Sequence, residues 1–377
     1  MIYLDNAATT LQKPLAVCKA MEQALLTCAN PGRSGHTPAM KAGEIVFACR
    51  EAAAELFGMN APERVVFTQN ATHALNLAIK SLLWEGGHAV LSGYEHNSVV
   101  RPLEAMRERG VSYTVASAPL FDETQLCLSI ADSIRADTKC VIVTQVSNVF
   151  GFALPMERIN AICREHRIPM IVDASQAAGV LPVRADQWDA AAFICMPGHK
   201  GLYGPQGTGM LLCCGEHFCR SLIEGGTGSL SIELTQPDFL PDALESGTLN
   251  VPGIAGLLEG IRFVLQKGKA IRQKESVLLR QTAEDLSVLP ETEVFYHPSC
   301  QSGVLSFRNR RLDPAEISEY LNQKGICVRS GLHCAPVAHR TGGTLPEGTV
   351  RLSFSAFNTK EEEKRLLWRL NEWIKIS

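Results

Sequence analysis

The stretch Pro169-Met170-Ile171-Val172-Asp173-Ala174-Ser175-Gln176 decides the fold, because four apolar residues run into a carboxylate and then into small and polar residues. A short apolar run that ends at a polar turn predicts a strand buried on both faces of a sheet. The same pattern recurs, with apolar runs at 64–68, 89–92, 140–144 and 191–196 and helical patterns at 74–83, 99–109, 157–166 and 174–179. Strands that alternate with helices predict an α/β fold with a mostly parallel sheet.

The alternation weakens after about residue 250. Residues 254–266 and 274–289 have helical patterns, and Gly268 lies between them. A smaller α+β unit is expected beyond them, with strands near 303–307, 326–329 and 349–354. A final helix is expected to begin at Thr359, where the Thr-x-x-Glu spacing to Glu362 predicts a capping box. We therefore expect an N-terminal segment 1–15 that packs near the active site or the small domain, a large domain 16–255, and a linking helix with a small C-terminal domain 256–377 that carries Cys334.

Composition excludes several classes of protein. The chain has 377 residues, a formal net charge of −3, 46% hydrophobic residues and 20% charged residues. No strongly basic surface is implied, so we expect no nucleic-acid partner. No apolar stretch is long enough for a membrane helix, and the first residues lack the basic and apolar regions of a secretory signal. The expectation is a cytoplasmic enzyme.

The 13 cysteines are scattered and form no Cys-x-x-Cys pair. No Cys/His cluster has zinc spacing, so we expect no metal site. Twelve of the cysteines are interpreted as small, reduced packing residues. The thirteenth, Cys334, follows an apolar run in Arg329-Ser330-Gly331-Leu332-His333-Cys334, where the neighbouring Arg329 and His333 are expected to favour a thiolate.

The ends of two predicted strands carry residues that suit a cofactor. Lys200 lies in a glycine-rich loop after the strand at 191–196, and Asp173 closes the strand at 169–173. Pyridoxal phosphate (PLP) requires a lysine for a Schiff base and a carboxylate at its pyridine nitrogen. Taken alone, Asp173 is equally consistent with the N-cap of a helix, and Lys200 with a solvated loop charge.

A phosphate cradle and an aromatic side chain complete this hypothesis. The helix start after Phe67-Thr68-Gln69-Asn70-Ala71-Thr72 offers backbone N–H groups and the Thr72 hydroxyl to an anion. Simple N-capping explains the same residues. His96 follows the next strand, where its ring is suited to stack on a cofactor.

In addition to these residues, motifs along nearly the whole chain resemble one family. The chain is similar to the class V, fold-type I PLP enzymes, and among them to the cysteine desulfurases of the selenocysteine lyase-like group II branch. The motifs, in order, are residues 3–10, 30–36, 67–76, 95–97, 147–148, 172–176, 198–200, 245–250, 328–335 and 350–353. The resemblance implies a large domain with a mostly parallel seven-stranded sheet and a smaller α+β C-terminal domain.

The resemblance also implies a role for each matching residue. Lys200 would bind PLP covalently, Asp173 would pair with the pyridine nitrogen, Gln176 would donate to the 3-oxygen, and His96 would stack on the ring and help move protons. Phosphate contacts would come from Ala71, Thr72, His199 and, across a homodimer interface, Thr248. Substrate contacts would come from Asn148, Arg351, His36 and Arg329.

The implied reaction removes sulfur from L-cysteine and yields L-alanine. Cys334 would be the nucleophile that receives the sulfur as a persulfide and passes it to an acceptor protein. Acceptors implied by the family serve iron–sulfur cluster assembly, thiolation or selenophosphate formation. Residues 330–345 are expected to form a mobile loop, and Gly342-Gly343-Thr344 fits that expectation.

Three departures from the family pattern mark a divergent member: Pro197 replaces a serine or threonine, Gly201 is an extra glycine, and Pro336 replaces a glutamine.

Two enzymatic alternatives stay open, a selenocysteine lyase and a class V aminotransferase or epimerase in which Cys334 takes no part. A non-catalytic scaffold that keeps the fold is a third, and the set of Lys200, Asp173 and His96 argues against it.

Overall fold

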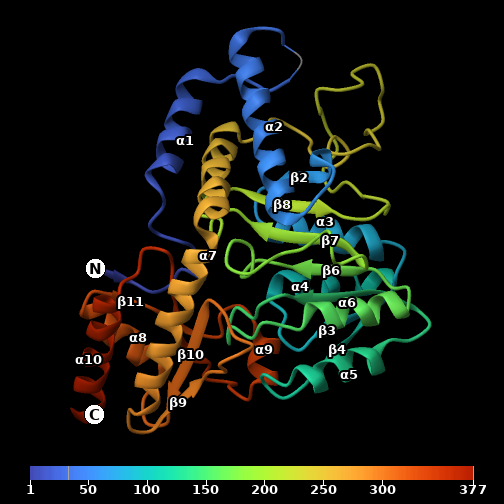
Figure 1. The fold of residues 1–377 in the computed structure, drawn as a ribbon. Coiled ribbons are helices and arrows are strands. Elements are labelled where there is room, and N and C mark those ends of the chain that lie inside the picture. The colour runs from blue at the N-terminus through green and yellow to red at the C-terminus, as the bar shows by residue number, and fades with distance from the viewer. Residues whose placement is uncertain (33, 377) are drawn as a thin grey trace.

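A seven-stranded sheet forms the centre of the computed structural model, which describes residues 1–32 and 34–376 (Figure 1). Its strands lie in the order β2 (Val65–Thr68), β8 (Gly209–Cys213), β7 (Ala191–Pro197), β6 (Met170–Asp173), β5 (Thr138–Thr144), β3 (Gly87–Ser92) and β4 (Val111–Ala116). Strands β7, β6, β5, β3 and β4 are mutually parallel, whereas β8 runs antiparallel to both β7 and β2. The mostly parallel sheet predicted from the sequence is confirmed.

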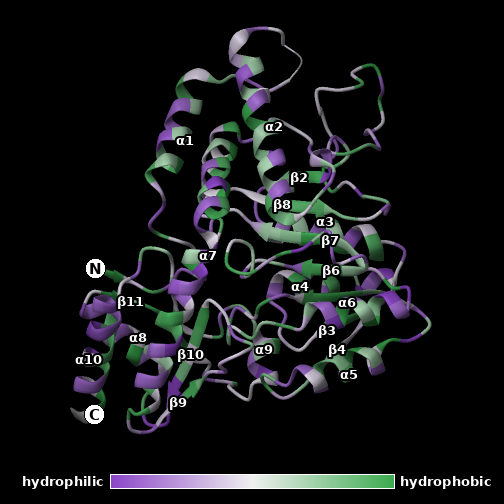
Figure 2. Ribbon diagram, in the orientation of Figure 1, coloured by the Kyte–Doolittle hydropathy of each residue, from purple (hydrophilic) through white to green (hydrophobic). Residues whose placement is uncertain are grey.

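Helices cover both faces of this sheet. They are α2 (Thr37–Phe57), α3 (Ala71–Leu83), α4 (Asn97–Ala105), α5 (Glu123–Ser133) and α6 (Met156–Glu165), with single 3₁₀ turns η1 (Pro62–Arg64) and η2 (Arg107–Arg109). A further helix, α1 (Leu15–Thr27), packs against the long helix α7 (Val251–Ser287). Alternate strand residues enter different cores: Val141 and Val143 pack with α2, α5 and α6, while Ile142 packs with α3 and α4. Burial on both faces explains why these strands are almost continuously apolar. Figure 2 shows the central strands, such as β7 and β8, as predominantly hydrophobic.

One long helix, α7 (Val251–Ser287), replaces the two helices predicted at 254–266 and 274–289. Gly268 does not interrupt it, because a glycine within a helix costs only about 1 kcal/mol relative to alanine and packing of the helix compensates. The first turns of α7 join the core under the large sheet, and its last turns join the C-terminal core. We propose that the two domains divide within this helix, near residue 255.

The C-terminal part is an α+β unit around a four-stranded antiparallel sheet ordered β12-β13-β10-β9. Its elements are β9 (Thr292–Phe295), β10 (Val304–Asn309), α8 (Pro314–Gln323), β11 (Ile326–Cys327), β12 (Arg329–Gly331), α9 (Pro336–Thr341), β13 (Thr349–Ser353) and α10 (Lys360–Ile376). The predicted capping box is present, since Thr359 N donates to Glu362 Oε2 at 3.0 Å and Glu362 N to Thr359 Oγ1 at 3.3 Å.

The N-terminal segment belongs to this unit, because β1 (Ile2–Tyr3) pairs in parallel with β11. Figure 1 shows the two chain ends on the same side as α8 and α10. Among the described residues, no helix has both the length and the apolar character that a membrane span requires.

Candidate active site

The carboxyl ends of the strands converge on a cavity of about 200 Å³. Strand β2 runs in the same direction as β7, since both are antiparallel to β8. The segments that follow β2, β3, β6 and β7 therefore open at the same edge of the sheet, where α/β proteins bind ligands. Eleven of the thirteen predicted site residues line this cavity: Ala71, Thr72, His96, Asn148, Asp173, Gln176, His199, Lys200, Arg329, Cys334 and Arg351.

Lys200 follows β7 in a turn that the N-terminal segment fixes. Thr10 N donates to His199 O at 3.0 Å, and Thr10 Oγ1 donates to Lys200 O at 2.8 Å. Close packing explains the extra glycine Gly201, because a Cβ at this position would lie 2.4 Å from Ala178 O. Burial lowers the pKa of the Lys200 amine to about 8, against the opposing attraction of Asp173. A lysine with this pKa exchanges protons readily near neutral pH.

Asp173 is 3% exposed at the end of β6. The helix predicted at 174–179 is wrong: these residues form successive turns, and Asp173 Oδ1 accepts a hydrogen bond from Ser175 N at 2.9 Å. The alternative that Asp173 caps a helix therefore fails. Its buried carboxylate faces the same cavity as Lys200, and a buried charge of this kind requires a partner.

The start of α3 also lines the cavity. Asn70, rather than Thr72, caps this helix by accepting from His73 N at 2.9 Å. The Thr72 hydroxyl instead contacts Ser98 Oγ at 2.9 Å. Ala71 and Thr72 thus present a helix N-terminus to the cavity, an arrangement that favours an anionic group.

His96 is held by its own helix. Its Nδ1 lies 2.8 Å from Ser98 Oγ and accepts from Ser98 N at 3.0 Å, at the N-cap of α4. Burial, with a smaller contribution from the positive Lys200, lowers the pKa of His96 to about 4, against the opposing effect of Asp173. The imidazole is therefore neutral at physiological pH, and its ring is available for stacking.

Two further polar residues of the cavity are already engaged within the chain. Gln176 Nε2 donates to Ala7 O at 3.0 Å, and His199 Nδ1 lies 3.0 Å from Thr9 Oγ1. Burial lowers the pKa of His199 to about 4, so this ring is neutral as well. Both contacts attach the cavity wall to residues 7–9 of the N-terminal segment.

Arg351 is 2% exposed and lies between Asp5 and Asn148. Its Nη2 donates to Asp5 Oδ1 at 2.7 Å and its Nη1 to Asn148 O at 3.0 Å, while its Nε has no hydrogen-bond partner among the described residues. Asn148 Nδ2 in turn donates to His333 O at 2.8 Å. This arrangement connects the segment after β5, the N-terminal segment and the C-terminal sheet around one buried cation.

Cys334 is exposed at the mouth of the cavity. Arg329 Nη2 lies 3.9 Å from its Sγ, and Asn97 N donates to its backbone oxygen at 2.8 Å. Residues 333 and 334 have φ values of 47° and 57°, a left-handed conformation that costs energy in a non-glycine residue. The backbone turn directs this segment of the C-terminal unit against α4 of the large sheet.

The prediction that His333 favours a Cys334 thiolate is wrong. Burial lowers the pKa of His333 to about 2, and its Nε2 lies 3.1 Å from Thr349 Oγ1, so the ring carries no charge. Arg329 is the nearby cation. Residues 330–345 also do not form a plain loop, because α9 lies within them and a Cβ on Gly342 would lie 2.3 Å from the Phe150 ring.

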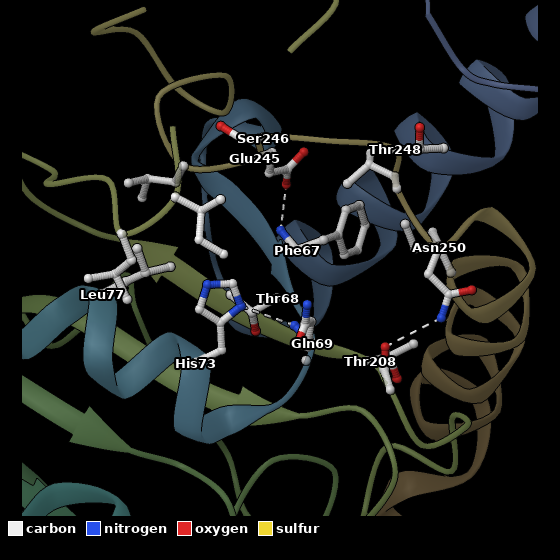
Figure 3. Close-up of a pocket in the computed structure, with 17 residues that line it drawn as sticks. Phe67, Thr68, Gln69, His73, Leu77, Thr208, Glu245, Ser246, Thr248 and Asn250 are labelled. Carbon is white, nitrogen blue, oxygen red and sulfur yellow. Dashed lines mark hydrogen bonds between the residues drawn. The ribbon is translucent and has the colours of Figure 1, made fainter. Parts of the chain in front are cut away.

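His36 and Thr248 lie outside this cavity, and their roles stay predictions. His36 is exposed and caps α2, with its Nδ1 accepting from Ala39 N at 3.3 Å. Thr248 lines a separate pocket of about 190 Å³ beside β2, which also contains Phe67, Glu245 and Asn250 (Figure 3).

The interpretation of twelve cysteines as packing residues fails for Cys18, which is exposed.

Sequence reasoning missed three functional candidates. Asp5 pairs with Arg351, Ser98 joins Thr72 to His96, and Glu95 lies fully buried beneath the cavity. Glu95 Oε1 accepts from Thr144 N at 2.7 Å and from Ser92 Oγ at 2.5 Å, while its Oε2 has no hydrogen-bond partner in the part of the chain that the structure describes. Burial raises the pKa of Glu95 to about 8. Glu95 lies in the family motif at 95–97, but no role was predicted for it.

Comparison with known proteins finds relatives that match this chain along nearly its full length. The family model for aminotransferase class-V matches residues 2–366. The chain is 34% identical to a probable cysteine desulfurase of Methanothermobacter thermautotrophicus, covering 98% of this chain and 94% of that one. It is 31% identical to a cysteine desulfurase of Klebsiella pneumoniae, covering 100% and 94%.

The solved structure of a cysteine desulfurase from Thermococcus onnurineus superposes with a TM-score of 0.91 at 32% identity, covering 100% of this chain and 95% of that one. The fold, the full-length match and the sequence identity agree. The chain belongs to the aminotransferase class-V family.

Proposed function

We propose that the protein is a PLP-dependent cysteine desulfurase that transfers the sulfur of L-cysteine to Cys334. The single observation that supports this most is the common cavity of Lys200, Asp173 and Cys334. Asp173 ends a strand of the large sheet and Lys200 follows another, whereas Cys334 follows a strand of the C-terminal sheet. A desulfurase needs a cofactor lysine and a nucleophilic sulfur at one site, whereas an aminotransferase needs no such thiol.

The residues of the cavity fit PLP. Lys200 has a buried amine of lowered pKa, Asp173 supplies a buried carboxylate, and the α3 N-terminus at Ala71 and Thr72 suits the phosphate. His96, neutral and fixed by Ser98, would stack on the ring. When bound, PLP supplies an electron-accepting ring that weakens bonds at the Cα of an amino acid attached through its nitrogen.

Each residue then has a task in the proposed reaction. Arg351 binds the substrate carboxylate, Lys200 takes up and returns a proton at its Nζ, and His96 assists. The sulfur of L-cysteine moves to Cys334 Sγ, so that one C–S bond breaks and one S–S bond forms. L-cysteine and the Cys334 thiol become L-alanine and a Cys334 persulfide, with the thiol proton retained in the products.

The proposal extends to partners. A persulfide on exposed Cys334 can be attacked by the thiol of an acceptor protein without unfolding. We further propose a cytoplasmic homodimer in which Thr248 contributes to the cofactor phosphate of the partner subunit, since Thr248 does not line the lysine cavity of its own chain.

Two measurements test this function. Purified full-length protein reconstituted with PLP should gain the visible absorbance of a protein-bound Schiff base, and Lys200→Ala should abolish it. L-cysteine should yield alanine with a gain of one sulfur atom on Cys334. Cys334→Ala should end turnover, while Cys18→Ala, at another exposed cysteine, should leave it unchanged.

Unchanged cysteine turnover in Cys334→Ala would overturn the desulfurase proposal. If that variant also releases selenide from L-selenocysteine or transfers the amino group, the alternative is a selenocysteine lyase or another class V activity. A wild-type sample without the absorbance band would remove the cofactor from the proposal altogether.

A further inference from the structure

A second pair of sulfur atoms lies close together outside the lysine cavity. Cys213 is the last residue of β8, and Cys219 follows six residues later. Their Sγ atoms are 3.9 Å apart, and Cys219 also contacts His217 O at 3.5 Å. Neither cysteine lines the cavity that contains Lys200. This pair therefore has no part in the function proposed above.

The third cysteine of the segment points elsewhere. Cys214 packs with the core on the opposite face of the sheet, and its Sγ contacts Met59 Sδ at 4.0 Å and Leu212 O at 3.8 Å. Cys213 and Cys219 both belong to the core under α3. Alternation along the end of β8 thus selects Cys219, not the adjacent Cys214, as the partner of Cys213.

The surroundings make Cys219 the more reactive thiol. Arg64 approaches from η1, where its Nη1 donates to Gly215 O at 2.9 Å and to Cys213 O at 3.4 Å. Once Cys219 ionises, the Cys213 S–H donates to it, and together with Arg64 this lowers the pKa of Cys219 against the effect of burial. The same hydrogen bond and complete burial raise the pKa of Cys213. A partly exposed thiol of lowered pKa next to a buried thiol of raised pKa is typical of a redox pair.

The backbone allows the two sulfurs to meet. A disulfide requires an S–S distance of about 2.0 Å, so the atoms must approach by roughly 2 Å. Residues 214–219 form no helix or strand and Cys219 is only half-buried, so this short segment can move while β8 stays fixed.

We propose that Cys213 and Cys219 are a redox-sensitive thiol pair that closes to a disulfide under peroxide. Hydrogen peroxide oxidises the Cys219 thiolate to a sulfenic acid and leaves as water. The Cys213 thiol then attacks that sulfur and releases a second water, so two thiols and one peroxide give one disulfide and two waters. The bond attaches the start of segment 214–250, which carries Thr248, to the end of β8.

The test uses the full-length protein with PLP, treated with hydrogen peroxide and then alkylated under denaturing conditions. Cleavage after Arg220, Lys200 and Glu216 separates fragment 201–216, with Cys213 and Cys214, from fragment 217–220, with Cys219. Mass spectrometry should find the two fragments joined, at a mass about 2 Da below their sum because two hydrogens are lost, and dithiothreitol should separate them. Cys334 is read independently on fragment 330–340.

Single cysteine-to-alanine variants identify which cysteine is linked to Cys219. The joined species should persist in Cys214→Ala and disappear in Cys213→Ala and Cys219→Ala. Should a variant fail to fold, tandem fragmentation of the wild-type species between residues 213 and 214 identifies the linked cysteine directly. Linkage through Cys214, or oxidation of Cys219 to a sulfinic acid without any joined species, would overturn the proposal.

Discussion

Asp5 Oδ1 accepts a hydrogen bond from Arg351 Nη2 at 2.7 Å, joining residues 346 positions apart in the sequence. The guanidinium is 2% exposed, so Asp5 supplies the carboxylate that a buried cation requires. Arg351 is also the residue proposed to bind the substrate carboxylate. The internal carboxylate therefore occupies a position for which the substrate would compete.

Asp5→Asn should tighten substrate binding and weaken the fold. Without the competing carboxylate, KM for L-cysteine should fall, whereas the free energy of unfolding should drop by about 1–3 kcal/mol because a buried charge loses its counter-ion. Steady-state kinetics and urea unfolding measure the two effects. Glu291→Gln, at an exposed ion pair with Arg311, should change neither. A raised KM in Asp5→Asn would show that Asp5 orients Arg351 rather than competing for it.

Lys200 should make the stability of the cofactor-free chain depend on pH. Its folded pKa of about 8 lies below the ordinary 10.5, so between these values the unfolded chain binds the extra proton. The free energy of unfolding should therefore rise with pH from 8 to 10.5, by about 2–3 kcal/mol relative to Lys200→Met. Urea unfolding at pH 7.5 and pH 10 measures this difference. Parallel pH profiles for the two proteins would contradict a buried charge at residue 200.

Glu95 should have the opposite effect on the pH dependence of stability, in the range below pH 8. Its folded pKa of about 8 lies above the ordinary 4.5, so between these values the folded protein binds the extra proton and stability falls as the pH rises. Glu95→Gln removes the titrating group while keeping the acceptor for Thr144 N, and should lose less stability between pH 5 and pH 8. Thermal unfolding at both pH values checks this, with the exposed Glu51→Gln as the matched control. An unchanged slope in Glu95→Gln would refute it.

Glu245 fixes the segment before Thr248 to β2. It forms a buried ion pair with Arg50, with Nη2–Oε2 at 2.5 Å. Its carboxylate also accepts a hydrogen bond from Phe67 N, which Figure 3 shows as a dashed line. Glu245→Ala leaves Arg50 buried without its counter-ion, with Val65 O as a remaining acceptor, and should lower the free energy of unfolding by about 3–5 kcal/mol. Glu216→Ala breaks the exposed pair with Arg64 and should cost at most about 1 kcal/mol. Equal losses in urea unfolding would show that burial does not govern these pairs.

The sequence by itself determined the strands and the chemistry at their ends. Apolar runs such as Cys140–Thr144 are readable because burial on both faces leaves only apolar residues acceptable. Parallel strands bring their carboxyl ends to one edge, which is why Asp173 and Lys200 were expected together and lie together. Local patterns failed where packing overrode them, as at Gly268 within α7 and in the turns after Asp173.

Tertiary structure alone decided the electrostatics of the site. Nothing in the sequence joins Asp5 to Arg351, or shows that His333 is too deeply buried to carry a charge. The same holds for Cys219, which meets Cys213 and not Cys214 because β8 sends successive side chains to opposite faces. The physical reason is that pairing and desolvation depend on distances across the folded chain, whereas strand and turn preferences depend on neighbours along it.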